Sequence, residues 1–118
     1  MTSKDSLGIR SQVLLWAAQR GSAAVLAACV FVHLATIIYA VRSGLSATEI
    51  LNRTHGNVAW AAFYAVFVIS VAVHAPIGLR NVLSETLGWR GSSLDWTVTV
   101  LGLALALWGF RAVYAVFA

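Results

Sequence analysis

Three long apolar runs, almost free of charge, constrain what this chain can fold into. Residues 21–41 and 58–79 carry no charged side chain over 21 and 22 residues, and residues 96–118 form a third run of 23 that only Arg111 interrupts. A helix needs about 20 apolar residues to cross a bilayer core. With 118 residues, of which 60% are hydrophobic, the chain has too little polar surface for a soluble domain. The sequence therefore predicts an all-α membrane protein with three transmembrane helices, in a single domain covering residues 1–118.

The residues around these runs set approximate boundaries. Residues 7–19 mix apolar and polar side chains in the manner of an amphipathic helix that lies on the membrane surface. In the loop after the first run, Ser46 and Glu49 match a helix capping box, and Ser93 or Asp95 is placed to cap the third span. We expect the transmembrane spans at about residues 21–42, 57–80 and 95–117.

The basic residues predict an orientation in the membrane. On the side of the N-terminus and the second loop there are five, namely Lys4, Arg10, Arg20, Arg80 and Arg90. The first loop and the third run hold three, namely Arg42, Arg53 and Arg111. An excess of Lys and Arg marks the cytoplasmic side, so we expect a multi-pass protein with a cytoplasmic N-terminus. The net charge of +4 then reflects membrane topology, and no nucleic-acid partner is expected.

Two histidines, His33 and His74, lie inside the apolar runs. An ionisable residue at that depth is costly and is taken as functional by default, although a neutral imidazole bonded to a nearby hydroxyl is the structural alternative. Zinc and proton relays are disfavoured, because the runs contain no Asp or Glu and the one cysteine is Cys29. Haem fits better, since its iron takes neutral imidazole and its ring wants apolar walls. His55 lies in a loop and is interpreted as an ordinary loop residue.

The two histidines lie at different predicted depths. If Arg20 and Arg80 mark the inner surface, a rise of about 1.5 Å per residue places His33 roughly 20 Å deep and His74 roughly 9 Å deep. A difference of about 10 Å argues against a shared iron, even in tilted helices. We therefore expect one ligand for each of two stacked haems, with the opposing ligands supplied by another chain. A partner is also expected because three helices cannot enclose two porphyrins.

A proline and a glycine follow His74 closely. Pro76 cannot donate a hydrogen bond to the carbonyl of Ala72, so we expect the helix to kink or open there. Gly78 lies one turn beyond His74 on the same face, which leaves room beside the imidazole ring. Arg80 ends the run, where it would reach haem propionates or simply anchor the helix at the interface.

With these features, the sequence resembles the C-type cytochrome b membrane anchor of succinate dehydrogenase and fumarate reductase. The family's first motif commonly reads His-Arg-x-Ser-Gly, and residues 19–23 here read QRGSA, followed by VFVHLA at residues 30–35. The second motif, His-x-x-x-Gly-Ile-Arg-His with an acid a turn later, is matched by HAPIGLRN at residues 74–81 and by Glu85. The resemblance extends from about Trp16 to the C-terminus. Among the departures from the motifs are Gln19, Ala23 and Asn81, in place of His, Gly and His.

The resemblance implies a place in a larger complex. In this family a flavoprotein subunit oxidises succinate, an iron–sulfur subunit carries the electrons, and a membrane anchor with haem b delivers them to quinone, or the reverse runs with fumarate. It thus implies three protein partners for this chain, namely the flavoprotein, the iron–sulfur subunit and a second membrane anchor subunit. It also implies a bacterial inner membrane location and no succinate chemistry on this chain.

The resemblance also implies roles for individual residues. His74 matches the haem b ligand nearer the cytoplasmic side, and His33 matches the extra ligand of two-haem members. Arg20 and Ser22 match positions near the quinone pocket, beside the iron–sulfur subunit. Gln19 is expected to donate a hydrogen bond to a quinone carbonyl from the same region.

Two other functions remain open at the level of sequence. The chain could keep the anchor fold with one haem or none and serve as a structural tether. A small transporter or channel subunit is a third reading, but the runs offer only scattered Ser and Thr residues and His33 as a polar pathway.

Overall fold

The computed structural model describes residues 3–118 of the chain, which form four helices. These are α1 (Ser3–Arg42), α2 (Ala47–Thr54), α3 (Val58–Leu87) and α4 (Ser92–Phe117), in a body about 60 Å long and 25 Å wide. Three helices of the described chain, α1, α3 and α4, are long and apolar enough to cross a membrane. The prediction of an all-α membrane protein with three spans is confirmed.

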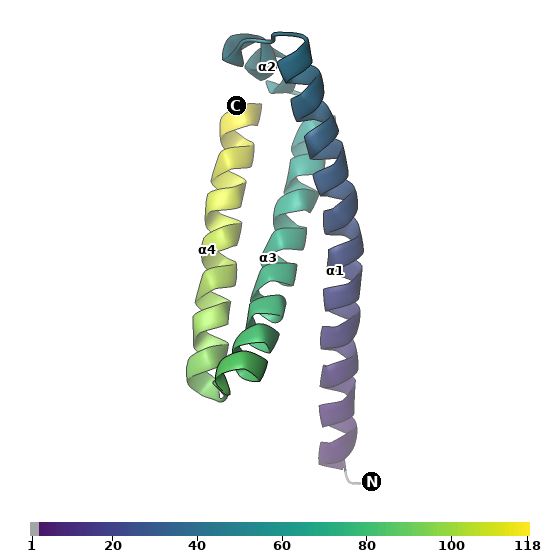
Figure 1. Cartoon of the computed structure of the whole chain (residues 1–118), viewed down its shortest axis with the longest axis vertical. Coiled ribbons are helices and arrows are strands. Elements are labelled where there is room, and N and C mark those ends of the chain that lie inside the picture. Colours follow the sequence, from purple (N-terminus) through teal and green to yellow (C-terminus); the bar gives the residue numbers. More distant parts are fainter. Residues whose placement is uncertain (1–2) are drawn as a thin grey trace.

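Helix α3 lies between α1 and α4 and packs against both (Figure 1). The α3–α4 contact is close because two glycines of α4 face α3. A Cβ at Gly102 would lie 2.8 Å from Pro76 Cγ, and a Cβ at Gly109 would lie 2.6 Å from Val68 Cγ1. Small residues of this kind let helix backbones approach in a membrane, where no hydrophobic effect drives the helices together.

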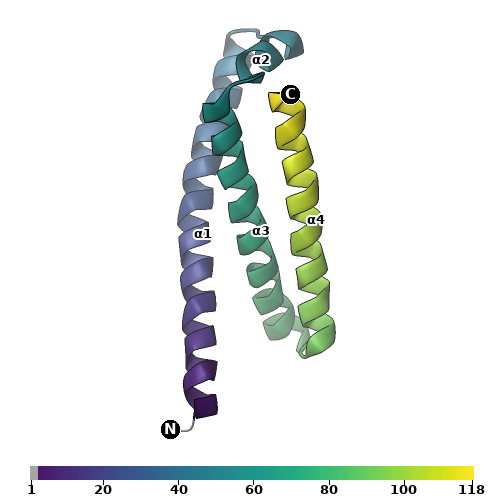
Figure 2. The same cartoon turned by 180° about the vertical axis from the view of Figure 1, so that it is seen from behind.

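The two ends of the molecule differ in what they contain. The N-terminus of α1 and the α3–α4 turn lie at one end, and α2 and the C-terminus lie at the other (Figure 1). At the second end, the amide of Gly56 donates to the carbonyl of Phe117 at 2.8 Å and joins the α2–α3 turn to α4. The N-terminal turns of α1 extend past the α3–α4 turn in both views (Figures 1 and 2). The predicted placement of the N-terminus and the second loop at a common end agrees with this arrangement.

The helices are longer than the predicted spans. Residues 7–19, which the sequence predicts as an amphipathic surface segment, are helical and continue into the first span without a break. Helix α3 likewise runs past residue 80 and ends only at Gly88, whose φ of 65° is readily adopted by glycine. Helix α3 also continues through Pro76 without ending there, and Gly102 of α4 faces this proline. Helices α1 and α3 therefore extend beyond the predicted spans at the end of the molecule that holds the N-terminus.

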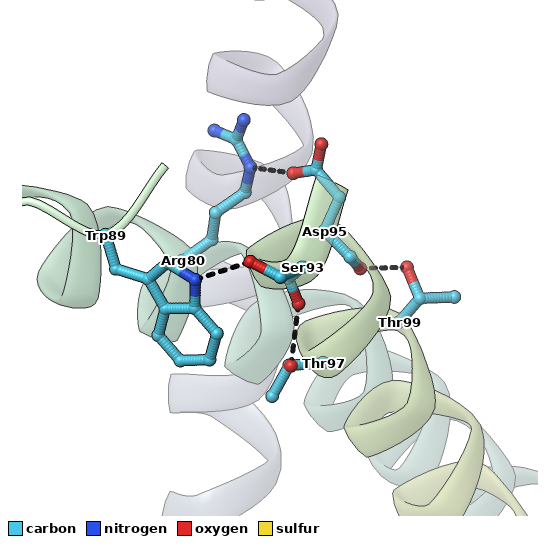
Figure 3. Close-up of polar contacts among 6 residues, drawn as sticks. All are labelled: Arg80, Trp89, Ser93, Asp95, Thr97 and Thr99. Atoms are coloured by element: carbon cyan, nitrogen blue, oxygen red, sulfur yellow. Dashed lines mark hydrogen bonds and ion pairs between the residues drawn. The ribbon is translucent and has the colours of Figure 1, made fainter. Parts of the chain in front are cut away.

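Of the two helix caps predicted from the sequence, the one of α2 is confirmed and the one of the third span is not. Ser46 and Glu49 form the capping box of α2, and the backbone N–H and hydroxyl of Ser46 hold the pKa of Glu49 below its ordinary value. The expected cap of the third span is wrong, because the N-cap residue of α4 is Gly91 and no side chain caps this helix. Both candidate caps have other partners, since Ser93 accepts a hydrogen bond from the indole of Trp89 and Asp95 pairs with an arginine of α3 (Figure 3).

Few side chains are buried within this chain alone. Among residues 8–118, only Cys29, Ser70, Leu94 and Val98 are fully buried, and many large apolar side chains are exposed, among them Phe31 at 80% and Trp96 at 71%. Three long helices with so small an interior must be covered by lipid or by other polypeptides.

The glycine contacts between α3 and α4 give a direct test of the packing. In an open helix position, Gly→Ala stabilises by about 0.8–1.0 kcal/mol, whereas Gly109→Ala forces a Cβ against Val68. We expect Gly109→Ala to lower the melting temperature of the detergent-solubilised complex. Gly21→Ala is the matched control, since nothing lies within 4 Å of that Cβ position. Equal melting temperatures for the two variants would contradict the packing described here.

Candidate functional site

His33 lies in the C-terminal third of α1 and faces aromatic residues of α3. Its ring makes edge contacts with Tyr64 and Phe67, with centroid distances of 5.9 and 5.6 Å and interplanar angles of 85°. The Nδ1 atom is buried without a hydrogen-bond partner. Unpaired buried polar atoms are rare in folded proteins, so this nitrogen calls for a ligand or a partner that the chain alone does not supply.

His74 lies on α3 and lines a cavity of about 460 Å³ between α1 and α3. Its Nδ1 atom is also buried and unpaired. We call this space the inner cavity; its lining residues are Gln12, Leu15, Trp16, Gln19, Arg20, Ala23, His74, Ile77, Arg80 and Asn81. One imidazole, two guanidinium groups and three amides thus surround a single cavity near the end that holds the N-terminus.

The two imidazoles lie at different levels along the helices. His33 contacts Phe67, and Phe67 is seven residues from His74 on α3, a rise of about 10 Å. On α1, His33 follows Arg20 of the inner cavity by thirteen residues, or about 20 Å. The two rings therefore do not face one another as opposing ligands of a single metal would, in agreement with the depth estimate from the sequence.

The inner cavity brings together most of the residues predicted for the inner site. Arg20 and Gln19 from α1 line it with His74 and Arg80 from α3, and the guanidinium of Arg20 lies 5.4 Å from the ring centroid of Trp16. Stacking of this kind orients a guanidinium group and limits its motion. Ser22 does not line the cavity, and its hydroxyl donates to the carbonyl of Gln19 at 3.2 Å.

Gly78 has a different neighbour from the one expected. A Cβ at this position would lie 3.1 Å from Nε2 of Gln19, so the space beside Gly78 holds the amide of Gln19. The Oε1 atom of the same amide is buried and unpaired. The room that the sequence predicts beside the imidazole is therefore used, at least in part, by a side chain of α1.

Arg80 is held by a residue that the sequence analysis assigned to helix capping. Its Nε donates to Oδ1 of Asp95 at 2.8 Å, and the terminal nitrogens point away from that carboxylate (Figure 3). Both side chains are about half exposed, at 43% and 56%. Asp95 thus orients the guanidinium at the edge of the inner cavity and leaves its remaining donors for another group.

A second cavity, of about 540 Å³, lies next to His33 and is bounded by α1, α2 and α3. We call it the outer cavity. Tyr39 and Arg53 also line it: the guanidinium carbon of Arg53 lies 5.7 Å from the centroid of the tyrosine ring, and Nη1 donates to the phenolic oxygen at 3.5 Å. The sequence predicts no site role for this pair. The one signal in the sequence is an arginine in the loop after His33, and the structure places this arginine in α2. His55 lies elsewhere, against the C-terminal end of α4, as expected of a loop residue.

The two buried imidazoles, of His33 and His74, are suitable ligands for haem iron. Among the described residues, no three His, Cys, Asp or Glu side chains gather in one place, so this chain alone builds no multi-ligand metal site. A haem iron needs only one imidazole from each side, and its ring tolerates apolar and aromatic walls. Each buried imidazole with an unpaired Nδ1 is therefore suited to hold such a group, through Nε2 as ligand.

The salt bridge of Arg80 gives a prediction about stability. We expect Asp95→Asn to change the unfolding free energy by less than about 1 kcal/mol, because half-exposed ion pairs contribute little. Chemical denaturation of the purified protein measures this, with Glu85→Gln as the control, since it makes the same chemical change at an exposed carboxylate of α3. A loss of several kcal/mol would mean that the pair is buried in the assembly.

Comparison with known proteins provides one match over nearly the whole chain. A family model described as the succinate dehydrogenase/fumarate reductase transmembrane subunit matches residues 3–115. No curated protein and no solved structure gives a significant match.

Proposed function

This chain belongs to the succinate dehydrogenase/fumarate reductase transmembrane subunit family, and from this premise we propose that it binds haem b and passes electrons between an iron–sulfur subunit and membrane quinone. The family consists of membrane subunits of enzyme complexes. The observation that supports haem binding is the pair of buried imidazoles, which lie at different levels and each have an unpaired Nδ1.

The proposed haem ligands are His74 at the inner level and His33 at the outer level. At the inner level, Arg80 is oriented by Asp95 and keeps donors free for the carboxylates of the group. At the outer level, the edges of Tyr64 and Phe67 form an apolar wall against the ring of His33. Haem, when bound, supplies a one-electron carrier at each level. The low burial within this chain supports a second anchor chain as the source of the opposing ligands.

The proposed quinone site lies at the inner cavity near Arg20. A quinone oxygen gains negative charge on reduction, and a fixed cation close to it stabilises that charge. Arg20 suits this role because the ring of Trp16 orients its guanidinium and because it lines the cavity. Gln19 lines the same cavity, and Ser22 lies one turn along α1 with its hydroxyl directed to its own helix. With the N-terminal end on the cytoplasmic side, this cavity would face the iron–sulfur subunit.

The haem assignment predicts separate losses. We expect the purified complex to show two b-type bands in a reduced-minus-oxidised spectrum. His74→Ala should remove the inner haem and His33→Ala the outer one, because each variant removes one axial ligand. His55→Ala is the control and should retain both bands. A colourless complex would leave only a structural anchor, and loss of both bands from either variant would contradict separate sites.

The quinone assignment predicts a loss of turnover with haem retained. Arg20→Leu should lower electron transfer to quinone about 100-fold or more, because it removes the charge that stabilises the reduced oxygen. Arg10→Leu is the matched control, since Arg10 lies on the same helix outside the inner cavity. Quinone reductase assays and haem spectra of both variants provide the measurement. Unchanged turnover in Arg20→Leu would exclude this site.

A further inference from the structure

Two complementary atoms remain unpaired in the inner cavity. They are Nδ1 of His74 on α3 and Oε1 of Gln19 on α1, both buried and without a hydrogen-bond partner in the described part of the chain. Both side chains line the same cavity. Because each unpaired atom carries a desolvation cost, a change that pairs them would stabilise the site.

Ligation would turn these two atoms into a donor and an acceptor. An amide oxygen can only accept a hydrogen bond. A neutral imidazole that binds iron through Nε2 keeps its proton on Nδ1 and must donate from that atom. The acceptor that His74 then needs is the chemical group that Gln19 presents.

Gly78 explains how the amide comes so close to α3. A Cβ at residue 78 would lie 3.1 Å from Nε2 of Gln19, a distance at which the amide would have to move. Gly78 is one turn from His74 on the same face of α3. The amide nitrogen of Gln19 is the end that lies against the glycine, which leaves Oε1 as the free end near that face.

We infer that Gln19 is a positioning residue that accepts a hydrogen bond from Nδ1–H of His74 when Nε2 ligates the inner haem, and that Gly78 is the glycine that admits it. The inference rests on the proposed haem function. An acceptor on the second nitrogen fixes the orientation of a ligating imidazole and makes it a stronger electron donor. Gln19 would therefore favour the oxidised state of the inner haem and lower its reduction potential.

The test is a redox titration of the inner haem in the assembled complex. Gln19→Leu should shift the ferric-to-ferrous ratio several-fold toward ferrous at a fixed ambient potential, because loss of the acceptor makes the ligating imidazole less basic. The electron paramagnetic resonance signal of the inner ferric haem should shift with it. Asn52→Leu is the control, since it also replaces an amide side chain by leucine but lies on α2, outside the inner cavity, and should leave the ratio unchanged.

Gly78→Ala provides a second and independent variant. It keeps the imidazole and the amide but displaces the amide, so it should shift the ratio in the same direction as Gln19→Leu. The double variant should shift no further than the larger single one, because both act through one contact. If Gln19→Leu loses the inner haem, the ferric-to-ferrous ratio of Gly78→Ala shows whether Gln19 acts on the reduction potential of that haem.

The outcomes separate this inference from the proposed function. An inner haem whose ratio is unchanged in Gln19→Leu, or in Gly78→Ala where the first variant loses haem, overturns the role of Gln19 and leaves the haem assignment intact. A wild-type complex without an inner haem overturns the proposed function itself.

Discussion

A polar atom without a partner is costly in hydrocarbon, and the described part of the chain buries three such side-chain atoms on its membrane helices. The atoms are Nδ1 of His33, Nδ1 of His74 and Oε1 of Gln19. Backbone groups in the spans are satisfied within the helices, which is the reason that helices cross the membrane at all. In the described structure the three side-chain atoms have no partner, although haem ligation by His74 would pair its Nδ1 with Oε1 of Gln19 in the contact inferred above. Their positions therefore mark the regions to which we assign the proposed functions, in a chain that is otherwise nearly uniform in chemistry.

Helix α3 organises those regions because it faces a different neighbour on each side. Toward α4 it presents Pro76 and Val68 to glycines, and the packing there leaves no space for a further methyl group. Toward α1 it presents His74 and the aromatic residues around His33, with cavities at both levels. The close contacts at these two glycines fix α4 against α3, and the chemically varied side chains of α3 lie toward α1.

The chain is an incomplete part of a larger membrane structure. With four fully buried residues among those whose burial is described, its helices expose apolar surface on most sides. Lipid satisfies such surface well enough, but it supplies no ligand for an imidazole. The match to a transmembrane subunit family of multi-subunit complexes gives the context in which other chains would supply those ligands.

The sequence by itself determined the three spans, the ends at which the loops lie, the capping box of Ser46 and Glu49, and the unequal levels of His33 and His74. All of these depend on composition or on counting along a helix, where a rise of about 1.5 Å per residue is constant. The same reasoning misjudged the α4 cap, because α4 begins at Ser92, which places Ser93 and Asp95 inside the helix, and Asp95 pairs with Arg80.

Only the tertiary structure decided which residues meet across helices: Gln19 with Gly78, Gly109 with Val68, and Arg53 with Tyr39. The physical reason is that these spans are apolar on every side. In a soluble amphipathic helix, the pattern of apolar residues indicates which face is buried. A membrane helix that is surrounded by lipid and partner chains has no such pattern. Its rotation and its register against a neighbour are set by shape, through glycines and bulky side chains, and shape complementarity between two helices cannot be counted along one of them.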